Sequence, residues 1–253
     1  MVRDAVRLAF GTLTVLPVRP PSRVDRGVAA WAMVLAPLVG TTLGAVAVLV
    51  AWVAGAVLDP LLVAVLVIGV LAALTRLIHW DGLADTADGL GSGRPAEEAL
   101  AVMRRSDIGP FGVFAIVAVF AAQVAAVVDL LGRGALGGVL AGVLLGRGAL
   151  ALACRSGVPA ARPEGLGAAV AGSVGPVQLV AGALVTALAL VVTGVLDPHL
   201  RWPALLLAAG SAAAWAAATT AYLRRRLGGM TGDTLGALVE TTTSIALVVL
   251  AAG

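Results

Sequence analysis

Charged and aromatic side chains are scarce in this chain of 253 residues, at 12% and 4%, whereas 60% of the residues are hydrophobic. A soluble domain is roughly half apolar and a quarter charged, so these few polar groups cannot cover a water-exposed surface. The mean hydropathy of +1.03 therefore indicates that lipid is the main solvent. The apolar runs are long and lack the alternation of a β-barrel, which predicts an all-α, polytopic membrane protein.

Lysine is absent and cysteine occurs once, so all 17 basic residues are arginines and no internal disulfide forms. The arginines sit at the ends of apolar runs, where membrane topology requires them, and we expect no nucleic-acid partner. The N-terminus does not resemble a signal peptide, because Arg3, Asp4 and Arg7 interrupt it and Pro17 ends it. Instead, residues 2–16 carry an apolar face and predict an interfacial helix.

Apolar runs of about 20 residues predict about seven transmembrane helices within one integral-membrane domain, residues 1–253. The predicted spans are 28–57, 60–78, 108–131, 135–153, 174–196, 203–223 and 236–252. The first is long enough to be tilted, or broken at Pro37 or Gly40. Glycines recur in the spans, which favours close helix packing within or between chains and leaves a homo-oligomer open.

The arginines also predict the orientation of the chain. If the N-terminus is cytoplasmic, the outer loops hold only Arg133 and Arg201, while most other arginines fall on the inner side. The same topology places the polar, glycine-bearing segments on that side, namely 79–107, 154–173 and 224–235. We therefore expect an inner cell membrane protein whose chemistry takes place at the cytoplasmic face.

Asp81, Asp85 and Asp88 stand at i, i+4 and i+7, which places three carboxylates along one stripe of a helix. Like charges at this spacing favour protonation unless a cation lies between them. At a membrane surface, the stripe predicts a site for a hard divalent cation that holds a phosphate. His79 precedes the stripe as a general base, a phosphate contact or a plain interfacial histidine.

Two further segments carry polar groups beside apolar spans. Arg104 and Arg105 are either ordinary topology signals or phosphate ligands, with Ser106 or Asp107 capping the next helix.

Asp233 is either the N-cap of the last helix or part of a second stripe with Ala237 and Glu240. Glu240 lies two turns into an apolar span, where an acid is costly and usually functional. The two stripes could hold two cations or close one site from both sides, which requires the Asp85 and Glu240 carboxylates to lie near each other.

Four motifs in order carry a family resemblance: HxDGLADTxDG from His79, MRxSxxGxxG from Met103, EGLG from Glu164 and GGxTGDTLGAxxE from Gly228. Together they resemble the adenosylcobinamide-GDP ribazoletransferase family, also called cobalamin (5'-phosphate) synthase, over almost the whole chain. The resemblance implies a magnesium-dependent enzyme of the cytoplasmic membrane. Such an enzyme joins alpha-ribazole or its 5'-phosphate to adenosylcobinamide-GDP and releases GMP. The expected partners are these molecules and membrane lipid.

The resemblance and the phosphoryl-transfer chemistry together suggest residue roles. The expected Mg²⁺ ligands are Asp81, Asp85, Asp88, Asp233 and Glu240. His79 or an acid such as Asp85 would take the ribazole hydroxyl proton. The expected substrate and phosphate ligands are Arg104, Arg105, Ser106, Arg147, Arg162 and Thr231.

Two other classes compete with this interpretation. CDP-alcohol phosphotransferases also begin an acidic motif with Asp-Gly, but they require an Ala-Arg pair, and no arginine follows Asp81-Gly82 here. A transporter would place its charges near the bilayer midplane and repeat its broken helices in two halves. In this sequence the acids cluster at one face and no such repeat is evident.

Overall fold

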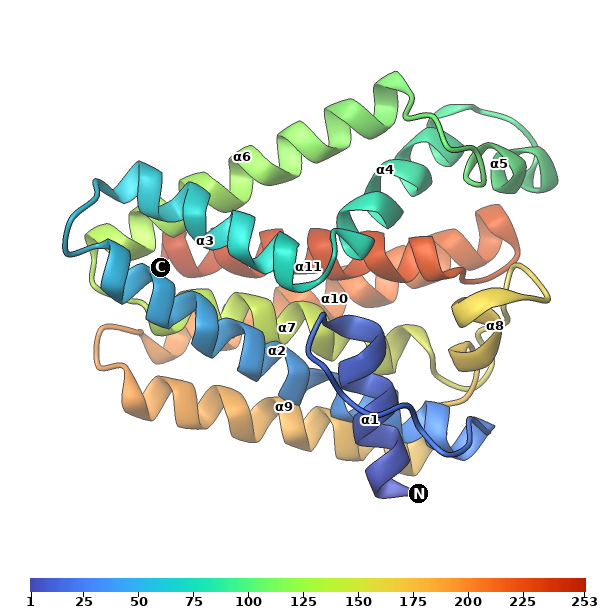
Figure 1. Ribbon diagram of the computed structural model, residues 1–253, viewed down its shortest axis with the longest axis horizontal. Coiled ribbons are helices and arrows are strands. Elements are labelled where there is room, and N and C mark those ends of the chain that lie inside the picture. Colours follow the sequence, from blue (N-terminus) through green and yellow to red (C-terminus); the bar gives the residue numbers. More distant parts are fainter.

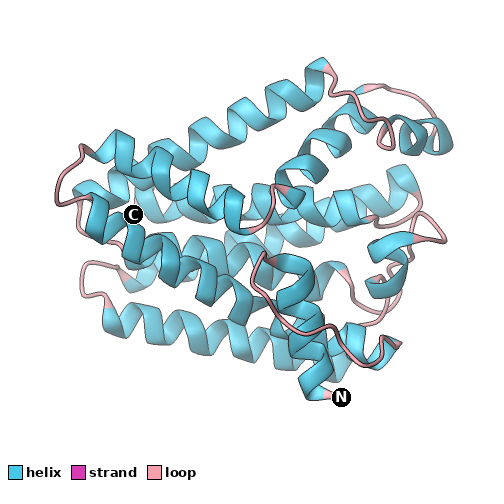
Figure 2. Ribbon diagram, in the orientation of Figure 1, coloured by secondary structure: helices cyan, strands magenta, loops and turns pink.

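The computed structural model describes residues 1–253 and contains eleven α-helices and no strands (Figures 1 and 2). This confirms the expected all-α class. The helices are α1 (Val2–Leu13), α2 (Arg26–Ala54), α3 (Pro60–Leu74), α4 (Ile78–Gly91), α5 (Ala96–Val102), α6 (Pro110–Gly132), α7 (Gly137–Ala153), α8 (Gly165–Val170), α9 (Pro176–Leu196), α10 (Trp202–Leu227) and α11 (Gly232–Ala252).

The long apolar helices lie side by side and form a multi-pass membrane bundle. Short connections near residues 55–59, 133–136 and 197–201 join them at one end, on the left of Figure 1. The short helices α5 and α8 and the α10–α11 connection lie at the opposite end, which we call the site end. The segments that were predicted to share one membrane face are thus at one end of the bundle.

The expected count of seven spans is not confirmed. Five helices are long and apolar enough to cross a bilayer, namely α2, α6, α9, α10 and α11, and the bent pair α3–α4 raises the number to six. The apolar helix α7 has 17 residues, which at about 1.5 Å per residue is shorter than a typical hydrocarbon core. Of the two alternatives for the first span, the break at Pro37 or Gly40 is excluded, because α2 runs through both residues.

The predicted span over 60–78 is interrupted. Arg76 and Leu77 both adopt left-handed backbone conformations, with φ of 52° and 58°, and the chain turns by 91° between α3 and α4. Such conformations cost non-glycine residues of order 1–3 kcal/mol each and occur mostly at functional sites. The turn lets α4 leave the direction of α3 and reach the loop before α6.

Glycines allow α7 to pack in the centre of the bundle between α2 and α11. A Cβ atom at Gly40 would lie 2.9 Å from the Leu144 Cα, and one at Gly44 would lie 2.8 Å from the Leu140 Cα. On the other side of α7, a Cβ at Gly146 would lie 2.8 Å from the Val239 carbonyl oxygen. The close packing expected from these glycines therefore occurs within one chain.

The N-terminal helix ends at Leu13, earlier than predicted, and packs against α2. Its buried face includes the charged residue Asp4, while the apolar residue Val2 is 62% exposed. The Asp4 carboxylate accepts hydrogen bonds from the Ser22 backbone N–H at 2.8 Å and from its hydroxyl at 2.9 Å. These bonds lower the pKa of Asp4 and hold the following loop against the helix.

Candidate active site

The centre of the site is the crossing of α4 and α11. A Cβ atom at Gly82 would lie 2.5 Å from the Asp233 carbonyl oxygen, and one at Gly236 would lie 3.0 Å from the His79 Cα. Only glycine permits backbones to approach this closely. Gly82 thus admits the neighbouring helix, and this brings Asp233 beside the first acidic stripe.

Asp81 and Asp85 have carboxylates that are free of protein partners. Asp81 is exposed and Asp85 is half-buried, and neither side chain takes part in a hydrogen bond or ion pair, unlike Asp88 and Asp233. Burial, followed by the negative charges of Asp81, Asp233 and Asp88, raises the pKa of Asp85 to about 6. Arg162 lowers this pKa in part, so negative charge at this point is only partly compensated.

Asp88 has a different task, because it caps α6. Its carboxylate accepts hydrogen bonds from the backbone N–H groups of Gly109 at 2.7 Å and Gly112 at 2.9 Å. The prediction that Ser106 or Asp107 caps this helix is wrong, since the N-cap is Gly109 and no side chain of the loop bonds there. The helix terminus that was expected to bind phosphate is already occupied by a carboxylate.

A cavity of about 500 Å³ lies between α4 and the loop before α6. Asp81 and Asp85 line it from α4, and Arg105 and Ser106 line it from the loop. The structure thus brings the first two predicted segments together around one space. Arg104 is exposed and its side chain contacts no polar partner. A cavity with free carboxylates and an arginine suits an anionic substrate that arrives with a cation.

Arg162 joins three parts of the site end. Its guanidinium donates to Asp233 Oδ2 at 3.1 Å and to the Leu100 carbonyl of α5 at 2.8 Å. Asp233 is not the N-cap of α11. That position is held by Thr231, which forms a capping box with Thr234. The interactions of Arg162 and Thr231 shown by the structure are therefore with the protein itself, and their predicted contacts with phosphate remain predictions.

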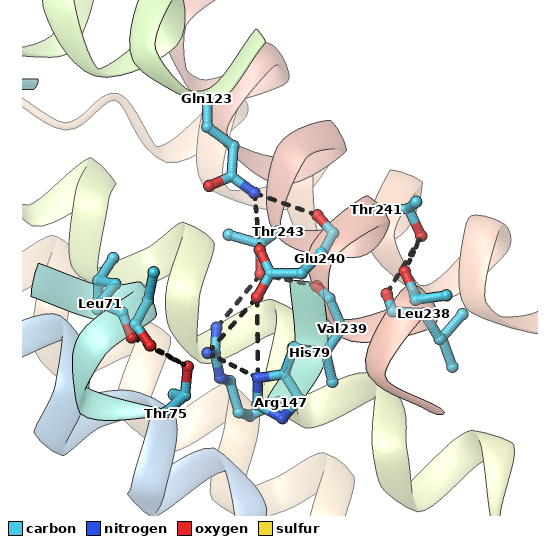
Figure 3. A network of polar contacts seen from close by, with 12 residues as sticks. Leu71, Thr75, His79, Gln123, Arg147, Leu238, Val239, Glu240, Thr241 and Thr243 are labelled. Atoms are coloured by element: carbon cyan, nitrogen blue, oxygen red, sulfur yellow. Dashed lines mark hydrogen bonds and ion pairs between the residues drawn. The ribbon is translucent and has the colours of Figure 1, made fainter. Parts of the chain in front are cut away.

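Glu240 lies in a buried polar network inside the bundle (Figure 3). Gln123 donates to Glu240 Oε2 at 3.0 Å, and the Arg147 guanidinium lies 3.9 Å from Glu240 Oε1. His79 Nδ1 is 3.4 Å from Arg147 Nη2 and 3.8 Å from Glu240 Oε1. Glu240 and Arg147 thus form a pair with each other, and the network reaches the site only through His79.

His79 also lines a second cavity, of about 250 Å³, together with Asp81 and Asp233. Asp81 lines both cavities and links them. No group of three or more His, Cys, Asp or Glu side chains is arranged to hold a metal ion. Because Mg²⁺ commonly binds through one or two carboxylates, water and substrate phosphates, the free carboxylates of Asp81 and Asp85 fit such an ion, whereas a site made by protein ligands alone is not present.

Sequence reasoning missed Gln123 and Thr243, which hold Glu240 and Arg147 at the centre of the network. The sequence did indicate that Gln123 has a partner, since an amide side chain within an apolar span is costly unless it forms hydrogen bonds. Its partners were not predictable, because they lie on another helix more than a hundred residues away.

A multi-pass helical bundle with acidic and basic side chains around cavities at one end is typical of a membrane enzyme with an anionic substrate. The chain belongs to the Cobalamin-5-phosphate synthase family, whose model matches residues 5–251. Relatives named adenosylcobinamide-GDP ribazoletransferase include one from Nocardioides sp., 44% identical over 99% of this chain and 100% of its own. Others are from Frankia casuarinae, 41% identical over 97% and 93%, and Pseudomonas aeruginosa, 36% identical over 99% and 100%. No solved structure matches the chain.

Proposed function

We propose that this protein joins alpha-ribazole or its 5'-phosphate to adenosylcobinamide-GDP and releases GMP, which forms adenosylcobalamin or its 5'-phosphate. The family and the names of relatives that match over their full length support this reaction. The structural observation that carries it is the cavity in which Asp81 and Asp85 lie across from Arg105 and Ser106. Phosphoryl transfer needs such a site, because charge on the transferred group must be neutralised while the nucleophile is aligned.

In the proposed step, a ribazole hydroxyl oxygen attacks the phosphorus nearer the corrinoid. A new P–O bond forms, the bond from that phosphorus to the bridging oxygen breaks, and GMP leaves with that oxygen. A carboxylate of the Asp81–Asp85 pair accepts the hydroxyl proton. Arg105 and Ser106 hold phosphate oxygens, while Arg162 keeps Asp233 in place beside the second cavity. The half-buried position of Asp85 lets it reach a substrate without full exposure to water.

We also propose Mg²⁺ as the cofactor, held by Asp81 and Asp85 and completed by water and substrate oxygens. When bound, it would neutralise charge on the diphosphate. Asp233 is a further candidate, since its negative charge acts on Asp85. Asp88 and Glu240 are weaker candidates, because backbone N–H groups and Arg147 already neutralise their carboxylates.

The reaction is tested with the purified protein in liposomes, by following GMP release from adenosylcobinamide-GDP. We expect release that requires both alpha-ribazole and Mg²⁺, with a cobalamin as the second product. Release without alpha-ribazole would indicate a hydrolase instead. Product formation from a lipid diphosphate substrate, or solute flux without GMP release, would favour the two competing classes.

We propose that the site end faces the cytoplasm at the inner membrane. Arg133 and Arg201 are the only arginines at the opposite end, and arginines are enriched on the cytoplasmic side of membrane proteins. The buried Cys154 can be replaced by alanine and a single cysteine introduced at an exposed position. Glu97→Cys should react with a membrane-impermeant maleimide only after the cells are opened, whereas Val57→Cys at the opposite end should react in intact cells. The reverse pattern would overturn the orientation.

A further inference from the structure

His79 was expected to be a base, a phosphate contact or a plain interfacial histidine, and its surroundings distinguish these roles. The side chain is 3% exposed and contacts charged groups only through Nδ1. We infer that Arg147 is a positioning residue that fixes His79 as the neutral tautomer with its proton on Nε2. His79 is then a hydrogen-bond donor to a phosphate oxygen of the substrate and not the general base. The identity of that substrate rests on the proposed function, whereas the tautomer does not.

The geometry at Nδ1 carries the first step. Arg147 Nη2 lies 3.4 Å from His79 Nδ1. A guanidinium has N–H donors and no acceptor, so the hydrogen bond between them requires a lone pair on Nδ1. A neutral imidazole that accepts at Nδ1 carries its proton on Nε2. Glu240 Oε1, at 3.8 Å from Nδ1, is too distant to hold a proton there by a hydrogen bond.

The network fixes Arg147 in the position that this tautomer needs. Its guanidinium lies 3.9 Å from Glu240 Oε1 and 3.5 Å from Thr243 Oγ1. Gln123 holds the Glu240 carboxylate from the opposite side, at 3.0 Å. Gly146, the residue before Arg147, allows α7 to approach α11 closely enough for these contacts. Arg147 therefore acts on the substrate only through His79.

The Nε2 atom carries the second step. It is buried and has no hydrogen-bond partner in the protein, although an unpaired buried N–H group is costly. The same side chain lines the cavity that Asp81 and Asp233 also line. Nε2 itself has almost no accessible surface in this structure, so a ligand oxygen in that cavity would satisfy the Nε2–H group once the ring turns toward it. A phosphate oxygen suits it best, because it only accepts hydrogen bonds and its charge is balanced by the cation that the carboxylates attract.

Nuclear magnetic resonance of the ring nitrogens tests the tautomer directly. The chain has two histidines, and the other one, His199, is exposed in a loop at the opposite end of the bundle. The variant His199→Gln therefore leaves a single histidine to be labelled with ¹⁵N. We expect one protonated and one unprotonated nitrogen, with the proton on Nε2. A proton on Nδ1, or on both nitrogens, would overturn the inference whether or not the proposed reaction occurs.

The donor role is tested by two substitutions of the same residue. His79→Gln keeps an N–H donor but is not a base at neutral pH, and His79→Leu keeps neither property. If His79 donates, the glutamine variant should retain activity within about tenfold while the leucine variant loses about a hundredfold or more, since removing one transition-state donor typically has that effect. Equal losses in the two variants would show that the basic nitrogen is needed.

The positioning role of Arg147 is tested with balanced charge, because an unpaired Glu240 could prevent folding. The double variant Arg147→Met/Glu240→Gln removes the donor to Nδ1 and leaves no unpaired charge, and the protein with the intact Arg147–Glu240 pair is its control. In the His199→Gln background, the control should keep the proton on Nε2, whereas the double variant should show both tautomers and a lower kcat. A double variant that loses activity but keeps the single tautomer would assign Arg147 a merely structural role.

Discussion

Asp81 and Asp85 at the site end accept no hydrogen bond from the protein, whereas Glu240, deeper in the bundle, is enclosed by Gln123 and Arg147. Asp81 and Asp85 belong to three acids at i, i+4 and i+7 on α4, and Glu240 stands at i+7 from Asp233 on α11, with Ala237 between them. The difference lies in what faces them: a cavity lined by a loop in the first case and the apolar centre of the bundle in the second. Free carboxylates are available to a cation and a substrate. The enclosed carboxylate of Glu240 balances the charge of Arg147, and this holds Arg147 beside His79.

The largest expected effect is at the free carboxylates. Asp85→Asn should insert and fold normally, yet lose about a thousandfold or more of transfer activity even at saturating Mg²⁺, because a neutral amide neither balances the cation nor accepts the proton. The measurement is initial-rate GMP release. Glu97→Gln, which changes an exposed acid on α5 outside the cavity, is the control and should remain active. Near-normal turnover of Asp85→Asn would remove Asp85 from the site.

The enclosed carboxylate should matter first for stability. Glu240→Ala leaves the charge of the buried Arg147 without a counter-ion and should lower the free energy of unfolding by about 3–5 kcal/mol. Asp129→Ala removes an exposed ion pair with Arg133, whose atoms are 2.9 Å apart, and should cost at most about 1 kcal/mol. Denaturant unfolding in detergent compares the two. Similar losses in the free energy of unfolding would show that the buried network contributes no more to stability than an exposed ion pair.

The crossing of α4 and α11 joins the cavity carboxylates to the buried Glu240 network. A methyl group added at this crossing should push the two helices apart. Gly236→Ala places a Cβ against the His79 backbone, and such overpacking costs about 1–3 kcal/mol and should also lower activity. Gly210→Ala is the matched control, because it is helical and nothing lies within 4 Å of its added Cβ. The control should be neutral or slightly stabilised. A fully active, stable Gly236→Ala protein would mean that the crossing can relax without harm.

Substitution of Asp88 should have the smallest effect, and it distinguishes a residue that caps α6 from one that binds Mg²⁺. Asp88→Asn keeps one acceptor for the Gly109 and Gly112 N–H groups, so we expect a loss of about 1 kcal/mol in stability and an unchanged Mg²⁺ concentration for half-maximal activity. The measurement is a Mg²⁺ titration of initial-rate GMP release, made with Asp88→Asn and with the unaltered protein. A large increase in the Mg²⁺ requirement of Asp88→Asn would make Asp88 a ligand as well as a cap.

Several features were predictable because they depend on local patterns. Long apolar runs predict helices wherever the backbone must satisfy its own hydrogen bonds in lipid, and the acidic stripe of α4 follows from helical periodicity alone. The break at Arg76 and Leu77 was not predictable, since neither residue favours a left-handed conformation. The cap of α6 was assigned to the wrong residue, because the carboxylate that fills it comes from Asp88 on a different helix.

The sequence by itself determined a helical membrane protein with its polar motifs at the ends of apolar runs, because hydropathy and periodicity are properties of neighbouring residues. Only the tertiary structure decided which of the similar carboxylates stay free, which one caps a helix and which one pairs with Arg147. Those outcomes depend on which helices cross and how closely, and that is set by contacts between glycines and backbones far apart in the chain.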